Sequence, residues 1–211
     1  MKNKLQKNLY WVLLVFLAIG LVYPAIGVIA LICMLAPVAV SFYKGRFWCG
    51  NFCPRGSFFD NVLSKVSPKK PIPKIFKSLW LRVFMLLLIM AVFGIQTYYA
   101  WGSLPAMGMV FIRIILVTTI VGIVLGMLYN QRTWCSFCPM GTLSSWVGAW
   151  KKRMPISTSD SCTNCNLCSK VCPMQLAPNS AKGDPSGFTC GDCIKCGVCI
   201  EKCPKKSLSF K

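Results

Sequence analysis

The sequence predicts a mostly α-helical protein: a four-transmembrane-helix bundle followed by a small cytoplasmic α+β domain. Three observations lead to this fold class. Of the 211 residues, 55% are hydrophobic, the apolar residues gather in long runs before residue 130, and the 14 cysteines recur in a few repeated motifs. An apolar run of about 20 residues is long enough to cross a bilayer as a helix. We therefore expect a membrane domain at residues 1–153 and a second domain at residues 154–211.

The apolar runs divide into four spans, which we place at residues 9–23, 25–43, 79–101 and 109–129. The first two spans form one stretch that is interrupted at Pro24, where a proline between glycines predicts a turn. The last two spans are joined by a short uncharged segment that also contains glycine and proline. The chain therefore crosses the bilayer as two successive helix hairpins.

Basic residues set the expected orientation of these hairpins. Lysines and arginines gather in residues 1–8 (Lys2, Lys4, Lys7), in residues 44–82 and in residues 132–153 (Arg132, Lys151, Lys152, Arg153). Such residues favour the cytoplasmic side of a membrane. We therefore expect a multi-pass protein of the inner (cytoplasmic) membrane, with both termini and the second domain in the cytoplasm. The net charge of +19 also suits anionic lipid or an acidic redox partner, and nothing else in the sequence indicates a nucleic acid.

The C-terminal segment contains two copies of the motif Cys-x2-Cys-x2-Cys-x3-Cys-Pro. The first copy holds Cys162, Cys165, Cys168 and Cys172, and the second holds Cys193, Cys196, Cys199 and Cys203. In this motif three cysteines bind one iron–sulfur cube, and the fourth, before proline, binds the other cube. The sequence therefore predicts a bacterial-type ferredoxin domain with two 4Fe–4S clusters.

The motif also assigns the ligands of each cluster. Cluster 1 takes Cys162, Cys165, Cys168 and Cys203, and cluster 2 takes Cys193, Cys196, Cys199 and Cys172. A zinc ribbon would show cysteine pairs rather than quartets that end in Cys-Pro. A register that begins at Cys190 is disfavoured because only the later register ends in x3-Cys-Pro.

Two shorter motifs follow the second and fourth spans. Each has Trp before its first cysteine and Phe-Cys-Pro-x-Gly at its second; the pairs are Cys49 with Cys53 and Cys135 with Cys138. The membrane domain therefore reads as a duplicated hairpin. Because both pairs fall on the same expected side, they could share a third 4Fe–4S cluster, act as a redox dithiol or transient metal site, or be structural thiols.

The prolines after the second cysteines suit the first turn of a helix. Apolar spacing in residues 54–66 and 139–151 predicts amphipathic helices that lie along the membrane surface. The amino ends of these helices would direct their dipoles toward an anionic cluster.

Residue types limit the chemistry of the chain. It contains no histidine, which excludes histidine-ligated haem on this chain, and it shows no nucleophile–base pair for catalysis. Asp60, on the expected surface helix after Cys53, is the acid best placed to accept a proton if these motifs carry out coupled proton transfer. Its ordinary interpretation is a solvated helix residue. We therefore expect an electron-transfer subunit rather than a self-contained enzyme.

The four spans, the paired Trp-Cys and Cys-Pro motifs and the C-terminal two-cluster motif together resemble the NapH/NosR-type membrane polyferredoxins. The resemblance covers essentially the whole chain. It implies electron relay between a quinone pool or membrane partner and cytoplasmic iron–sulfur carriers. An alternative is an assembly or regulatory protein that supports metal-centre maturation of a partner oxidoreductase, as some relatives do.

Overall fold

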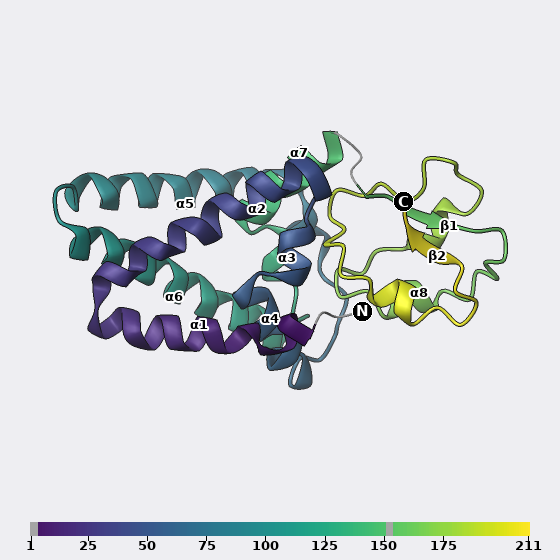
Figure 1. The fold of residues 1–211 in the computed structure, drawn as a ribbon, viewed down its shortest axis with the longest axis horizontal. Helices are drawn as coiled ribbons and strands as arrows, with labels where there is room; N and C mark the ends of the chain where they lie inside the picture. The colour runs from purple at the N-terminus through teal and green to yellow at the C-terminus, as the bar shows by residue number, and fades with distance from the viewer. Residues whose placement is uncertain (1–3, 151–153) are drawn as a thin grey trace.

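The structure is a computed structural model that describes residues 4–150 and 154–211. Lys2, the basic residues 151–153 and the expected domain boundary at residue 153 lie outside the described residues. The chain folds as a helical domain followed by a small C-terminal domain (Figure 1).

Four apolar helices build the helical domain: α1 (Lys4–Val22), α2 (Ala30–Lys44), α5 (Leu79–Tyr99) and α6 (Leu104–Leu128). They run side by side along the long axis of the molecule (Figure 1). The segment Pro24–Lys44 and the helices α5 and α6 are long and apolar enough to cross a membrane. Because α1 is apolar but shorter, the fourth crossing remains a prediction.

The expected turn at Pro24 is confirmed. Helix α1 ends at Val22, and Pro24 begins the 3-10 helix η1 (Pro24–Ile29) that leads into α2. Proline suits this place because its fixed φ angle starts a helix and it has no N–H to leave unpaired. The chain therefore turns at η1 and returns along the bundle as α2.

Two glycines allow η1 to lie against α6. A Cβ on Gly27 would overlap the carbonyl oxygen of Gly108, and a Cβ on Gly108 would overlap the carbonyl oxygen of Pro24. Only residues without side chains permit this backbone contact. Close approach of this kind is a common way for helices to pack in membranes.

Replacing Gly108 by alanine should destabilise the helical domain by about 1–3 kcal/mol, because the added methyl group meets backbone that cannot move aside. Gly94→Ala is the matched control, since a Cβ at this glycine of α5 meets nothing within 4 Å. The control should be neutral or slightly stabilising. Thermal unfolding in detergent compares the two variants, and equal midpoints would contradict the packing argument.

The cysteine motifs of the helical domain lie at the end of the bundle nearest the C-terminal domain (Figure 1). The connecting elements are α3 (Phe47–Asn51), α4 (Pro54–Asn61), η2 (Leu63–Lys65), η3 (Lys74–Lys77), η4 (Trp134–Ser136) and α7 (Pro139–Trp150). The expected surface helices correspond to α4 with η2 and to α7. Phe59 and Leu63 pack in one buried core with Trp134 and Phe137, so the two copies fold against each other.

The C-terminal domain is small and joins its two ends in one sheet. Strand β1 (Ile156–Thr158) pairs antiparallel with β2 (Leu208–Phe210). Between the strands lie α8 (Leu167–Lys170), η5 (Pro178–Ala181) and α9 (Val198–Glu201). Ile156, Cys199 and Leu208 form its buried core, in agreement with the expected α+β character.

Candidate iron–sulfur sites

The two motifs of the helical domain share a pattern of backbone hydrogen bonds. The amide of Cys49 donates to the carbonyl of Arg46 at 3.1 Å, and the amide of Cys135 donates to the carbonyl of Arg132 at 3.0 Å. The second cysteines donate in the same way to the carbonyls of Trp48 and Trp134, both at 3.0 Å. The sequence repeat is therefore a structural repeat, although one motif is a residue shorter than the other.

The two motifs meet at one cavity. A cavity of about 260 Å³ is lined by Cys49, Cys53, Cys135 and Cys138 together with apolar side chains of α1, α2, α5 and α6. The structure thus places the four cysteines of the two motifs around one space. We call this space the motif cavity.

The protein holds these four thiols half-buried at the wall of the motif cavity. Burial raises the pKa of the Cys53 thiol to about 12. Burial also raises the pKa of Cys49, an effect that the charge of Arg46 opposes. Because iron binds thiolates, loading the motif cavity with metal would release these protons.

Two buried arginines connect the motifs by reaching across to each other's copy. Arg132 donates from Nη1 to the carbonyl of Cys49 at 3.2 Å, and Arg46 donates from Nη2 to the carbonyl of Cys135 at 2.7 Å. They are 0% and 2% exposed, respectively. Each arginine stands three residues before the first cysteine of its own motif. Two positive charges therefore adjoin the motif cavity.

A glycine makes room for each arginine. A Cβ on Gly56 would lie 2.9 Å from Nη1 of Arg132, and a Cβ on Gly141 would lie 2.6 Å from Nη2 of Arg46. Both glycines occupy the same place in their motifs, two residues after the Cys-Pro proline. The glycine of Cys-Pro-x-Gly is therefore explained by the arginine of the opposite copy.

Each buried arginine has a carboxylate partner. Arg132 binds Asp60 with two hydrogen bonds of 2.8 Å, and Arg46 lies 3.4 Å from Asp192 in the C-terminal domain. Asp60 is 7% exposed and also accepts from Gln6 at 3.1 Å. Its interpretation as a solvated helix residue is wrong, because a buried carboxylate requires such a partner.

Two buried donors that line the motif cavity have no partner among the described residues. They are Arg46 Nε and Trp134 Nε1. Buried donors are costly when unpaired. An anionic group rich in sulfur acceptors fits this surrounding, as does the set of four thiols. The residues of the motif cavity therefore fit a 4Fe–4S cluster.

The two cysteine loops of the C-terminal domain also match each other. The second and fourth residues after the first cysteine have left-handed backbone in both copies: Asn164 and Asn166 in one, Lys195 and Gly197 in the other. Gln175 and Lys206, three residues after the last cysteine of each copy, do the same. Left-handed backbone is uncommon outside glycine. Its recurrence shows that both loops turn in the same way.

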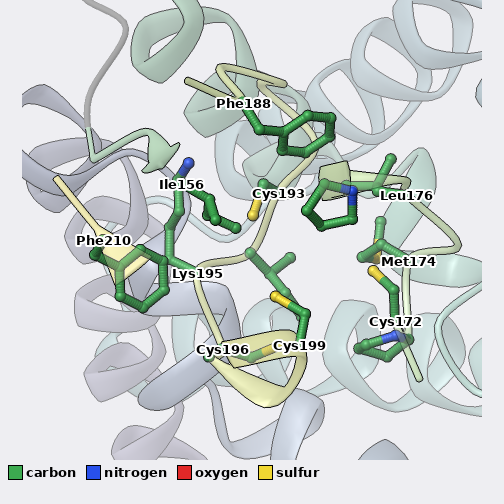
Figure 2. Close-up of a pocket in the computed structure, with 14 residues that line it drawn as sticks. Ile156, Cys172, Met174, Leu176, Phe188, Cys193, Lys195, Cys196, Cys199 and Phe210 are labelled. Carbon is green, nitrogen blue, oxygen red and sulfur yellow. The ribbon is translucent and has the colours of Figure 1, made fainter. Parts of the chain in front are cut away.

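The second loop closes a pocket with the last cysteine of the first copy. Cys193, Cys196 and Cys199 line this pocket together with Cys172. Figure 2 shows these cysteines with Ile156 and Phe210 at the left of the view, Met174 and Leu176 at the right, and Phe188 at the top. The four residues are those that the sequence assigns to cluster 2.

The residues assigned to cluster 1 are more exposed. Cys168 and Cys203 pack against the core of the C-terminal domain, and Cys165 is exposed. Cys203 lies 3.3 Å from the hydroxyl of Ser207, an interaction that lowers the pKa of its thiol. The structure places these four residues on matched loops, and their joint ligation remains a prediction.

Across residues 4–150 and 154–211, no three potential metal-ligating side chains converge on one metal position. In a cube each thiolate binds a different iron, so its ligands surround the group rather than meet at one point.

The sequence interpretation missed Arg46, Arg132 and Asp192 as parts of the sites. A signal was present for the arginines, because both motifs read Arg-x-Trp-Cys. For Asp192 no local signal exists, since its partners Arg46 and Arg82 lie far away in the sequence.

Family models match both parts of the chain. The model described as "4Fe-4S binding domain" matches residues 26–73 and 106–157, so that each match contains one motif of the helical domain. The model described as "4Fe-4S dicluster domain" matches residues 154–204.

The chain is also similar to proteins of several organisms. An uncharacterized protein of Methanocaldococcus jannaschii is 27% identical over 192 residues, 82% of this chain and 75% of the relative. The ferredoxin-type protein NapH of Haemophilus influenzae is 28% identical over 191 residues, 83% of this chain and 66% of the relative. The pyruvate synthase subunit PorD of Thermotoga maritima is 33% identical over 65 residues, 31% of this chain and 65% of the relative. No solved structure matches the chain.

Proposed function

We propose that this chain is a membrane polyferredoxin of the NapH type, to which it is similar, and that it relays electrons between a quinone pool or membrane partner and cytoplasmic redox carriers. The two 4Fe–4S family models that match the chain support an iron–sulfur electron-transfer protein. The relay itself is supported by one observation above all: the four motif cysteines line a single apolar cavity within the helical domain.

The proposed ligand sets follow the pairing in the structure and the motif rule. Cys49, Cys53, Cys135 and Cys138 hold a membrane cluster, Cys193, Cys196, Cys199 and Cys172 hold cluster 2, and Cys162, Cys165, Cys168 and Cys203 hold cluster 1. Clusters of this kind take up and release single electrons. The membrane domain spans residues 1–153 and the ferredoxin domain residues 154–211.

The motif cavity suits a quinone in its apolar part. Beyond the cysteines, its lining includes Leu13 and Phe16 of α1, Met34 of α2, Phe93 of α5, and Phe111 and Ile115 of α6. An apolar ring and isoprenoid tail favour such a lining. We propose that quinone binds here, beside the membrane cluster.

The proposed location is the inner membrane, with both termini and the ferredoxin domain in the cytoplasm. The basic segment between α2 and α5 supports this orientation, since residues 44–82 carry many lysines and arginines. The short uncharged link between α5 and α6 supports an outward-facing turn.

Cys49→Ser tests the membrane cluster. The wild-type protein, purified without oxygen, should contain about twelve irons, and the variant about eight, because one cube is lost. Cys33→Ser is the matched control, since Cys33 lines the same cavity outside both motifs and should leave about twelve irons. Iron and sulfide analysis with EPR reads the result, and eight irons in the wild type and both variants would exclude the membrane cluster.

A quinol tests the relay in the same samples. A soluble quinol analogue should reduce the clusters of the wild type and of Cys33→Ser, and should fail with Cys49→Ser. Failure in a wild type that holds all its iron would refute electron entry from quinol. Lost metallation of a partner oxidoreductase together with that failure would favour the assembly role instead.

A further inference from the structure

The two cysteine loops of the ferredoxin domain have similar backbones, but one loop is exposed and the other is buried. In the first loop the residues at the second and fourth places, Asn164 and Asn166, are exposed. In the second loop the matching residues, Lys195 and Gly197, are buried, and Lys195 is only 4% exposed. A lysine is rarely buried without a packing reason. The difference arises because the second loop is covered by the helical domain.

The second loop contacts the first cysteine motif of the helical domain directly. Asn51 donates from Nδ2 to the carbonyl of Lys195 at 3.2 Å. A Cβ on Gly50, the residue after Cys49, would overlap the carbonyl oxygen of Ile194 and lie 3.4 Å from Cβ of Cys196. The loops that carry Cys49 and Cys196 therefore touch without an intervening layer.

Asp192, the residue before Cys193, binds three side chains of the helical domain. Its carboxylate accepts from Arg82 at 2.9 and 2.7 Å, from Arg46 at 3.4 Å and from Ser145 at 3.1 Å. Three of these four contacts come from arginines. The carboxylate therefore bridges the two domains.

The repeat explains why this carboxylate comes from the other domain. Counted from the Cys-Pro prolines, Ser145 of the second copy stands where Asp60 stands in the first copy. Arg132 has Asp60 as its partner, whereas the second copy offers a serine at that place. Asp192 pairs with Arg46 and accepts from this serine, so the ferredoxin domain supplies the carboxylate that the second copy lacks.

The segment after Cys172 makes a separate contact with the helical domain. Gln175 accepts from the amide of Ile72 at 2.8 Å and donates to the carbonyl of Lys70 at 2.9 Å. Lys77 donates to the carbonyl of Met174 at 3.4 Å. Both chain segments that supply the cluster 2 cysteines therefore face the helical domain.

We propose that the Cys193–Cys199 loop is the docked, membrane-proximal end of the ferredoxin domain, with Asp192 as the residue that latches it. This docking has a consequence that rests on the proposed function. Electrons pass from the membrane cluster to cluster 2 and then to cluster 1, or in the reverse order. In each step one electron passes, so that one cluster is oxidised as its neighbour is reduced.

Asp192→Asn tests the latch without any electron transfer. Hydrogen–deuterium exchange of the full-length protein in lipid nanodiscs should rise roughly tenfold or more in residues 46–52 and 191–197, because a desolvated charge pair is lost. Asp160→Asn is the matched control: Asp160 is an exposed carboxylate of the same domain, and its loss should leave exchange unchanged. Unchanged exchange in Asp192→Asn would overturn the latch.

Two cysteine variants test the order of the clusters. Cys165 and Cys196 occupy the same place in the two loops, so that serine at either position removes one ferredoxin cluster in a matched way. With a quinol analogue as the reductant, Cys165→Ser should reduce its remaining ferredoxin cluster as fast as the wild type. Cys196→Ser should reduce its remaining cluster at least roughly a hundredfold more slowly, since the nearer cluster is missing.

The outcomes separate this proposal from the proposed function. Dithionite should reduce the remaining clusters of both variants, and iron analysis confirms that they are present. The opposite pattern of rates, or equal rates, would overturn the proposed order. A wild type that quinol fails to reduce would refute the quinol relay alone, because the exchange experiment still decides whether the Cys193–Cys199 loop is docked.

Discussion

Replacing Arg132 by methionine should destabilise the helical domain by about 3–5 kcal/mol, because it breaks a buried ion pair by removing the guanidinium that binds Asp60. Arg132 and Asp60 are 0% and 7% exposed, respectively, and the pair is joined by two short hydrogen bonds. The variant also loses the donor to the carbonyl of Cys49. Unfolding in detergent by heat or denaturant measures the change.

Two further variants identify the cause. Arg113→Met removes an exposed arginine of α6 and should change stability little. Arg132→Met combined with Asp60→Leu should recover much of the loss, since neither charge is then buried alone. A double variant as unstable as Arg132→Met would show that the broken ion pair between Arg132 and Asp60 is not the cause.

Replacing Arg46 by glutamine should lower the reduction potential of the proposed membrane cluster by roughly 90 mV. Two unit charges about 8 Å apart at an effective dielectric of about 20 interact by about 2 kcal/mol, which corresponds to that potential for one electron. The buried guanidinium favours the more negative, reduced cluster. An EPR-monitored redox titration of the membrane cluster gives the shift.

Lys44→Gln provides the control for this prediction. It removes the same charge two residues earlier in the sequence, from an exposed side chain, where water and salt screen the interaction. Arg46→Lys should keep most of the potential because it keeps the charge. A shift in Lys44→Gln equal to that in Arg46→Gln would show that overall charge, rather than the buried guanidinium, sets the potential.

Local features of the fold could be predicted from the sequence because local chemistry dictates them. Pro24 ends one helix and begins the next element at the expected place, and the Cys-Pro prolines begin α4 and α7. The four motif cysteines could be grouped because iron–sulfur chemistry demands few spacings. Each cysteine pair follows the second helix of its hairpin. Because the two hairpins pack together, the two pairs are expected to lie close to each other.

Long-range pairs could not be predicted in this way. Arg82 and Asp192 are 110 residues apart in the sequence, and many basic residues could have served a single carboxylate equally well. The short amphipathic pattern after Cys53 predicts a surface position for Asp60. In the structure Asp60 is buried because α1 packs against α4. Such pairs are fixed by tertiary packing, on which sequence periodicity carries no information.

The exchange of arginines between the motifs has a consequence for biosynthesis. The carbonyl of Cys49 receives its donor from Arg132, which the ribosome adds much later. Arg46 likewise waits for Asp192, 146 residues later. The cysteine loop after α2 therefore reaches its final form only after Asp192 has been translated. We expect the proposed membrane cluster to form only after that point.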